Sequence, residues 1–303
     1  MSVRGDRIAV DGTTRFLVFL SYFDGVRRAQ AGDPAPDLAF VAPFVDGIRV
    51  LPNWWASTCP LRSGADTLID LDGAIRPGSW AALERLLDAS VAHGLIVDVS
   101  FTRETVTDNA VPARALAPGL YERALVELVG SDAYLKGRYP NVLVDVQNEW
   151  ERFADAQTIE RLLARVHQAD PSRVLTASVS GERYRVAGRD IPTMLAAYHD
   201  PRGPEWFSRA VVSGAVAAIR QQVSQPIYLQ EPMPWGTVCD GQVHDESPEH
   251  HRTALEAARG AGAAAWTFHT RLTFDLAGES LAEKVRRAEH AGLSRALGML
   301  RDV

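Results

Sequence analysis

Residues 79–101 read SWAALERLLDASVAHGLIVDVSF and contain one complete helix-to-strand unit. Apolar residues recur at helical spacing as far as His93, and Gly94 stands just past the helix, where a left-handed residue is favoured. The next seven residues form a short, nearly continuous apolar run, which is typical of a parallel strand buried on both faces. The segment therefore predicts a helix with Ser79 as N-cap, a turn at Gly94 and a buried strand.

The same alternation of helical segments and apolar runs extends along the chain. Ser247 is a second predicted N-cap, with Glu249 in the first turn of its helix, and Gly262 repeats the position of Gly94. The connections after the first and fifth strands have weaker helical spacing. The pattern predicts helices at 79–93, 114–139, 154–169, 204–223, 247–261 and 281–300, and strands at 16–23, 47–52, 95–101, 142–148, 174–180, 194–199, 227–230 and 263–268.

Eight strand-helix units favour a closed (β/α)8 barrel, an α/β fold of the TIM type. Residues 16–300 supply about 36 residues per unit, enough for one barrel with little decoration, so residues 1–303 are interpreted as a single domain. A doubly wound open sheet is the structural alternative, because eight units can also be laid flat. Residues 7–16, with Asp11-Gly12 as a type I′ turn, predict a small N-terminal β-hairpin that plugs the bottom of the barrel.

Composition and charge exclude several classes of function. The chain has 32 Lys and Arg against 38 Asp and Glu, a formal net charge of −6, and its basic residues are scattered, so no nucleic-acid partner is expected. No apolar run reaches the roughly 18 residues that a bilayer requires, so no membrane segment is expected. The charged N-terminus lacks a signal-peptide core, which predicts a cytoplasmic protein as given, or a secreted one if a leader was removed. Cys59 and Cys239 fit neither a disulfide framework nor a zinc site.

Reactive side chains in parallel α/β folds lie at the carboxyl ends of the strands, where the loops converge. Here those ends are dense in carboxylates, amides and aromatic rings, which suits a neutral, polyhydroxylated ligand. In strand order they carry Tyr22 and Asp24; Arg49 with Asn53-Trp54-Trp55; Ser100 to Arg103; Asn148-Glu149-Trp150; Ser180; Tyr198-His199-Asp200; Glu231; and Trp266 with His269.

Glu149 and Glu231 are the best candidates for a catalytic pair. Each ends an apolar strand, where a carboxylate is costly unless it faces a polar cavity. They stand three strands apart, so their side chains can converge across the top of a barrel, and such a pair divides acid and nucleophile roles in glycoside hydrolysis. The structural alternatives are that Asn148-Glu149 caps a helix and that Glu231, before Pro232, is an ordinary loop carboxylate.

These motifs resemble those of glycoside hydrolase clan A, the retaining barrel enzymes that include the family 5 cellulases and mannanases. The signature of the clan is an Asn-Glu pair ending the fourth strand and a glutamate ending the seventh, matched here by Asn148-Glu149 and Glu231. The resemblance implies Glu149 as acid/base, Glu231 as nucleophile and Asn148 as donor to the sugar 2-hydroxyl. It further implies that Arg49 supports the nucleophile and that Trp266 floors the sugar site.

Two positions depart from the family 5 pattern. Ser100 stands where strand three usually ends in histidine. The histidine and tyrosine of strand six are usually two residues apart, whereas Tyr198 and His199 are adjacent and must point to opposite sides of their strand. Only one of them can face the sugar.

The sequence thus predicts a retaining glycosidase that needs no metal or organic cofactor and binds a carbohydrate substrate. Burial beside Trp150 and the field of Glu231 are expected to raise the pKa of Glu149. Arg49 is expected to keep Glu231 charged, although it could instead pair with Asp46 or Asp98. The predicted substrate-binding residues are Arg49, Asn53, Trp54, Asn148, Tyr198, His199, Trp235 and Trp266.

Two rival functions remain open. A metal-dependent barrel hydrolase would use His199, Asp200, Asp98 and His269. A non-catalytic carbohydrate-binding barrel would also show aromatic residues in its pocket, but decayed sites usually lose one carboxylate, and both Glu149 and Glu231 are present.

Overall fold

Eight parallel strands form the central sheet of the protein. The computed structural model describes residues 1–53, 67–105, 114–181, 184–199, 201, 203–232, 245, 247–270, 273, 279–287 and 291–300. All eight predicted strands are present, each shorter than its apolar run at one end or both. They are β4 (Leu17–Ser21), β5 (Gly47–Val50), β6 (Ile96–Ser100), β9 (Val142–Asp145), β10 (Val174–Thr176), β11 (Ala196–Tyr198), β12 (Ile227–Leu229) and β13 (Ala265–Phe268).

The sheet closes into a barrel. Its strands run in the order β10-β9-β6-β5-β4-β13-β12-β11, with β13 beside β4. Parallel bridges between Leu175 and Met194 and between Val179 and Tyr198 join the two remaining edges. The fold is therefore a (β/α)8 barrel, and the flat doubly wound alternative is wrong.

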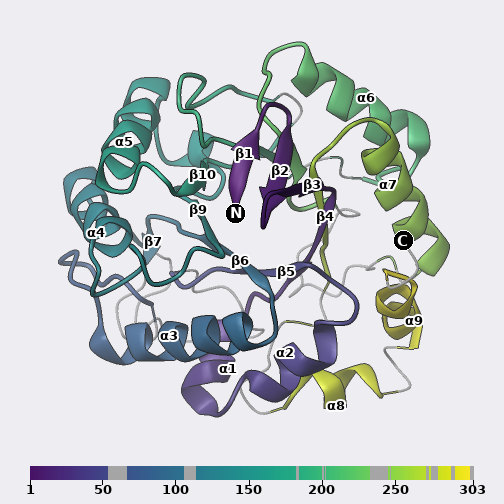
Figure 1. The fold of residues 1–303 in the computed structure, drawn as a ribbon, viewed down its shortest axis with the longest axis horizontal. Helices are drawn as coiled ribbons and strands as arrows, with labels where there is room; N and C mark the ends of the chain where they lie inside the picture. The colour runs from purple at the N-terminus through teal and green to yellow at the C-terminus, as the bar shows by residue number, and fades with distance from the viewer. Residues whose placement is uncertain are drawn as a thin grey trace.

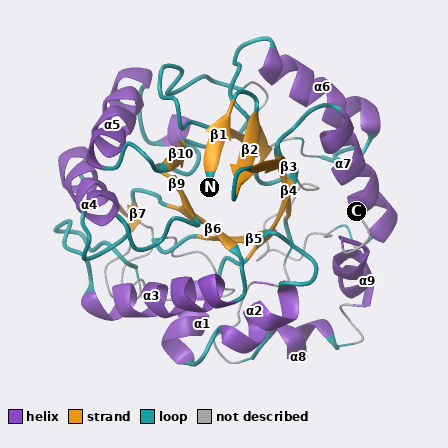
Figure 2. Ribbon diagram, in the orientation of Figure 1, coloured by secondary structure: helices purple, strands orange, loops and turns teal. Residues whose placement is uncertain are grey.

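Helices surround the barrel as an outer ring (Figures 1 and 2). The weak connection after the first strand contains two short helices, α1 (Gly25–Ala31) and α2 (Ala35–Val41). The other helices are α3 (Pro77–Ala92), α4 (Pro118–Gly130), α5 (Ala156–Ala169), α6 (Arg209–Arg220), α7 (Pro248–Gly260), α8 (Leu281–Val285) and α9 (Ala291–Met299). Among the residues described, no helix has the length and apolar character needed to cross a membrane.

Local capping chemistry explains where several helices begin. Ser247 caps α7 by accepting a hydrogen bond from the His250 amide, and Gly94 and Gly262 adopt positive φ, both as predicted. Ser79 is not an N-cap, because α3 already begins at Pro77, whose fixed φ suits the first helical turn.

Further helix boundaries differ from the sequence prediction, including the end of α4 at Gly130 rather than at residue 139 and the start of α5 at Ala156 rather than at residue 154. Helix α4 starts at Pro118 because residues Arg114–Ala115 form β8, which pairs with β7 (Glu104–Thr105). Helix α6 starts after its own cap, Ser208, rather than at residue 204. The predicted helix 281–300 consists of two helices, α8 and α9.

A small antiparallel sheet covers one end of the barrel. The predicted hairpin is present as β2 (Arg7–Val10) and β3 (Thr13–Arg15), and positive φ at Asp11 and Gly12 fits the type I′ turn. A third strand, β1 (Ser2–Arg4), was not predicted; it pairs with β2. The buried Ile8 packs with residues from the starts of the barrel strands, as expected for a bottom plug. Figure 1 shows the small sheet in front of the barrel strands.

Alternation along the strands separates the barrel interior from the helix layer. Phe19 and Tyr228 fill the interior, their ring centroids 5.1 Å apart. Gly47 is required beside them, because a Cβ there would lie 2.6 Å from both the Ile96 carbonyl oxygen and the Phe19 ring. The plug and these rings close the barrel at the amino ends of its strands, so the polar interior positions lie toward the carboxyl ends.

Candidate active site at the carboxyl ends of the strands

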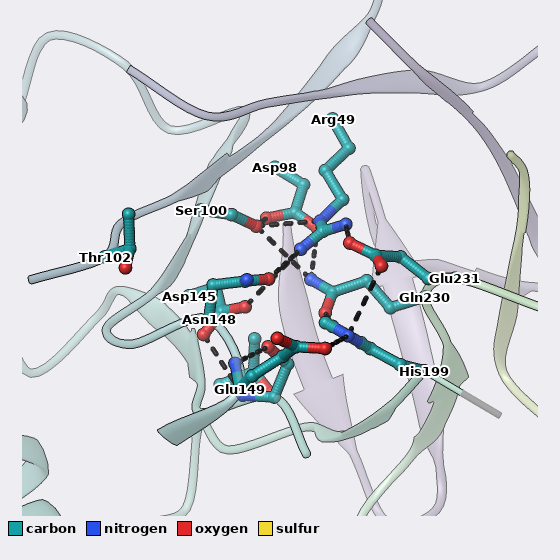
Figure 3. Close-up of polar contacts among 12 residues, drawn as sticks. Arg49, Asp98, Ser100, Thr102, Asp145, Asn148, Glu149, His199, Gln230 and Glu231 are labelled. Atoms are coloured by element: carbon teal, nitrogen blue, oxygen red, sulfur yellow. Dashed lines mark hydrogen bonds and ion pairs between the residues drawn. The ribbon is translucent and has the colours of Figure 1, made fainter. Parts of the chain in front are cut away.

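Arg49 is the hub of the polar cluster at the carboxyl ends (Figure 3). Its side chain is completely buried on β5. The guanidinium donates to Glu231 Oε1, to Asn148 Oδ1 at 2.7 Å and to Ser100 Oγ at 2.8 Å. Of the two alternatives for Arg49, the Asp46 pair is wrong, since Asp46 binds Arg15. The Asp98 pair coexists with the Glu231 contact.

Three carboxylates surround that one guanidinium. Besides Glu231, Asp98 lies 3.5 Å from Nε and Asp145 lies 4.0 Å from Nη2 of Arg49. Burial raises the pKa of Asp98 to about 6, although Arg49 opposes the shift, and burial also raises the pKa of Asp145. Burial alone would lower the pKa of Arg49, but the three negative charges raise it, so the arginine stays ionised.

The backbone aims Glu149 into the same space. Glu149 adopts a left-handed conformation, with φ 49° and ψ 55°, between β9 and the short 3-10 helix at Trp150–Arg152. This conformation costs a non-glycine residue about 1–2 kcal/mol, which the surrounding structure must supply. The Glu149 amide donates to Ser178 Oγ at 3.2 Å, and its carboxylate forms an ion pair with Arg152.

His199 lies between the two glutamates. Its Nδ1 atom is 3.5 Å from Glu149 Oε1 and 3.4 Å from Glu231 Oε2 (Figure 3). Because both oxygens lie close to one nitrogen, they are at most about 7 Å apart, a limit that includes the retaining spacing and overlaps only the shortest inverting pairs. The structure thus brings together Arg49, Asn148, Glu149, His199 and Glu231, as the sequence predicted.

Three other predicted binding residues, Tyr198, Asn53 and Trp266, make contacts away from this cluster. Tyr198 points to the outside of the barrel, where its hydroxyl donates to the Gly181 carbonyl and its ring contacts Tyr184, so His199 is the inward member of the pair. Asn53 is fully buried, and its amide binds the Thr102 carbonyl and the Ile69 backbone N–H. Its contacts are those of a loop-fixing residue.

Trp266 does not have the predicted place at the floor of the sugar site. The sequence resemblance placed it under the sugar, but the side chain is completely buried and packs toward His251 of α7. Thr267, its neighbour, is the inward residue, because it bonds Tyr228 Oη inside the barrel at 2.9 Å. Strand alternation therefore directs Trp266 into the helix layer.

We accordingly expect Trp266→Ala to destabilise the fold rather than weaken substrate binding. Loss of a buried indole typically costs about 3–5 kcal/mol. Trp80→Ala is the matched control, because Trp80 is also buried, against Tyr134 on the outer ring. Urea unfolding should show a similar loss for both variants, with KM nearly unchanged in the folded protein. A tenfold rise in KM for Trp266→Ala without loss of stability would restore the sugar-floor role.

Some predicted residues lie outside the described part of the chain. These are Trp54 and Trp235 of the substrate-binding set and Asp200 of the rival metal set. The remaining residues of the metal set do not converge on one point: His199 Nε2 contacts Gln230, Asp98 binds Ser100, and His269 contacts Ser21 Oγ. In the described ranges, no group of three or more His, Cys, Asp or Glu side chains has the arrangement of a metal site.

Two residues of the site were not predicted from the sequence. Gln230 links Asp98 to His199, and Arg152 pairs with Glu149. Strand alternation shows only that Tyr228 and Gln230 face the same side, and the register with the neighbouring strands decides which side that is. The spacing of three residues between Glu149 and Arg152 would have suggested their contact within a helical turn.

The fold and site together define a (β/α)8 barrel with a buried arginine and two facing glutamates at the carboxyl ends of its strands. No protein-family model and no curated protein matches the sequence. Solved structures do match its fold, and they include glycoside hydrolase family 5 enzymes, among them endoglucanases and mannosidases.

Three such structures illustrate the likeness. A glycoside hydrolase family 5 enzyme from Prevotella bryantii B14, in complex with a xyloglucan tetradecasaccharide, has a TM-score of 0.61 and 10% identity over 89% of this chain and 87% of its own. GH5_18 from Streptomyces cattleya, in complex with Manβ1-4GlcNAc, has a TM-score of 0.61 and 15% identity, over 94% of this chain and 80% of its own. An exo-β-1,4-mannosidase from Opitutaceae bacterium strain TAV5 has a TM-score of 0.63 and 14% identity, over 100% of this chain and 62% of its own. At these identities the likeness establishes the fold, which agrees with the resemblance seen in the strand-end motifs.

Proposed function

We propose that this protein is a retaining glycoside hydrolase that uses Glu231 as nucleophile and Glu149 as acid/base. The observation that carries the proposal is the placement of both carboxylates against His199 Nδ1, at 3.5 and 3.4 Å. Retaining enzymes hold their two carboxyl groups about 5–5.5 Å apart, because one of them attacks the sugar directly. The upper limit of about 7 Å between the facing oxygens is compatible with that spacing.

The reaction proceeds by two displacements at the anomeric carbon. Glu231 attacks that carbon and forms a glycosyl-enzyme ester, while the bond to the leaving oxygen breaks and Glu149 protonates that oxygen. Glu149 then removes a proton from water, the water oxygen attacks the same carbon, and Glu231 leaves as a carboxylate. Two inversions give a product with the configuration of the substrate.

The contacts of each glutamate suit its assigned role. Arg49 binds Glu231 Oε1 and favours the ionised form that a nucleophile needs. The same guanidinium holds Asn148 Oδ1 and so directs the amide NH2 of Asn148 away from itself, available as a donor to a sugar hydroxyl. Arg152 stabilises the charged form of Glu149, which the second displacement requires. This cation opposes the rise in the pKa of Glu149 that burial was expected to cause.

The substrate is proposed to be a neutral oligosaccharide or glycoside. Polar residues that hydrogen-bond one another fill the cluster, and Ser100 replaces the larger histidine of the family pattern. Proteins of similar fold were crystallised with xyloglucan and Manβ1-4GlcNAc ligands, which supports carbohydrate as the class of ligand. Fold alone does not define chemistry, so the proposal depends on the carboxylate pair.

The test is hydrolysis of a panel of chromogenic β-glycosides, manno- and gluco-oligosaccharides of increasing length, and polysaccharides. With any substrate that turns over, proton NMR of the first product anomer should show retention, and a chelator should leave the rate unchanged. Inversion would overturn the double displacement. Loss of activity with the chelator, restored by added metal, would favour the metal-dependent rival. Binding without turnover across the panel would favour the non-catalytic rival.

A further inference from the structure

The side-chain amide of Gln230 connects a buried carboxylate to the histidine between the glutamates. Gln230 Nε2 donates to Asp98 Oδ2 at 2.7 Å, and Gln230 Oε1 lies 3.0 Å from His199 Nε2 (Figure 3). All three side chains are essentially completely buried. The contacts therefore form in the barrel interior, where an unmatched polar group is costly.

The chemistry of the partners fixes which group donates and which accepts in the hydrogen bonds that join Asp98, Gln230 and His199. Above its pKa of about 6, Asp98 is ionised and has only acceptor oxygens, which accept from Ser100 Oγ at 3.0 Å and from Gln230 Nε2 at 2.7 Å. The amide must present its NH2 to Asp98 and therefore its oxygen to His199. An amide oxygen cannot donate, so His199 carries a proton on Nε2.

The consequence appears at the other ring nitrogen. Neutral histidine with a proton on Nε2 has a lone pair at Nδ1, and that lone pair faces Glu149 Oε1 and Glu231 Oε2. Three acceptors facing one another repel unless one of them holds a proton. The group therefore favours one retained proton, either on Nδ1 of an imidazolium or on a glutamate.

We propose that Gln230, oriented by Asp98, is a positioning residue that locks His199 in the Nε2–H form and thereby makes the group of His199, Glu149 and Glu231 retain the proton that Glu149 delivers. This inference rests on the proposed function. Gln230 touches neither the sugar nor the reacting atoms and acts through His199.

Other charged groups lie around the relay formed by Asp98, Gln230 and His199. Some of them favour loss of the retained proton and others favour its retention. Arg49 from β5 and Arg152 beside Glu149 favour loss of the retained proton. Asp98 from β6 and Asp145 from β9 favour its retention. These charges stay in place when Gln230 is changed to another residue of similar size.

Replacing Gln230 by leucine should move the pH profile of kcat/KM in one direction. In Gln230→Leu, neutral His199 can shift its proton from Nε2 to Nδ1 and donate to the glutamates, which stabilises the fully deprotonated pair. The alkaline limb of kcat/KM should therefore move to lower pH, by roughly half to one unit, which is the worth of one hydrogen bond. KM should change little.

The decisive readout is the tautomer of His199, measured by 15N NMR at a pH above the alkaline limb. The chain has eight histidines, so the His199 signal is assigned by its absence in His199→Gln. Wild type should show the Nε2–H form, and Gln230→Leu should show Nδ1–H or a mixture. Gln230→Glu should rescue the wild-type pattern, because one oxygen accepts from His199 while the other shares a proton with Asp98.

Gln225→Leu is the matched control, because Gln225 is also buried and bonds the Arg189 carbonyl near the other end of β12. This variant should change neither the tautomer of His199 nor the alkaline limb of kcat/KM. An Nδ1–H form in wild type, or an unchanged tautomer in folded Gln230→Leu, overturns the proposal; the wild-type measurement does so even if the variant does not fold. Because NMR needs no turnover, inactivity on every glycoside would contradict the proposed function and leave the tautomer result standing.

Discussion

Glu231→Ala should stop hydrolysis of every glycoside, and sodium azide should then restore turnover with a glycosyl azide of inverted configuration. The variant lacks the carboxylate that forms the glycosyl-enzyme, so a small anion can occupy its place and attack the anomeric carbon once. Glu149→Ala should behave differently. It should slow substrates with poor leaving groups by about 10²–10⁴-fold but spare glycosylation by substrates whose leaving group departs unaided.

Azide also distinguishes the two roles by stereochemistry. In Glu149→Ala the glycosyl-enzyme still forms, and its interception by azide completes a second inversion, so the azide product should have the configuration of the substrate. NMR of the two azide products checks both assignments. Glu151→Gln is the control, because Glu151 follows Glu149 closely but binds Ser180. The Glu151→Gln variant should hydrolyse glycosides without added azide. Exchanged azide stereochemistry between the two alanine variants would exchange the roles of Glu149 and Glu231.

The eight strands could be predicted because the physical signal for each strand is local, whereas barrel closure was favoured over a flat sheet only by the number of residues per unit. Each parallel strand is a short apolar run between turn residues, and Gly94 and Gly262 lie where the helix-to-strand turn needs positive φ. The helix starts were less predictable, since proline and serine compete as first-turn signals. At α3, Pro77 begins the helix two residues before the expected serine cap.

The candidate site was predictable where a residue lies at a strand end and faces inward. His199 and Tyr198 show the limit, because adjacency proves that they face opposite ways but not which one faces the barrel interior. The register with the neighbouring strands decides it, and register is a tertiary property. Trp266 fails for the same reason: a family motif suggested its role, but Thr267 occupies the inward face of this strand.

Arg49→Met should have the largest combined effect on stability and activity. The guanidinium is the cation placed against Glu231, Asp98 and Asp145, and removal of one partner from a buried ion pair costs about 3–5 kcal/mol. The free energy of unfolding should fall by that order, and kcat/KM of the remaining folded protein should drop at least about 10³-fold, because Glu231 loses both its position and its charge.

The loss of stability in Arg49→Met should depend on pH. The pKa of Asp98 is already raised to about 6 in the folded protein, mainly by burial and against the opposing charge of Arg49. A carboxyl group whose pKa is higher in the folded than in the unfolded state binds its proton more tightly when folded, so the free energy of unfolding falls as the pH rises through that interval. Without Arg49 the interval extends to higher pH. Urea titrations should therefore show a larger deficit at pH 8 than at pH 5.

Arg173→Met separates stability from catalysis. Arg173 is another buried arginine, at the amino end of β10 and away from the glutamates, and it binds Asp170 and the backbone carbonyls of Tyr139 and Val142. Its loss should lower the free energy of unfolding while kcat/KM of the folded fraction stays near that of wild type. Adding Asp98→Asn to Arg49→Met should recover part of the stability, because one buried charge without its cation is removed, and should recover no activity, because Glu231 still lacks its support. If Arg49→Met kept normal kcat/KM, or unfolded at the same urea concentration as wild type at both pH values, Arg49 could not be the group that holds Glu231 in place.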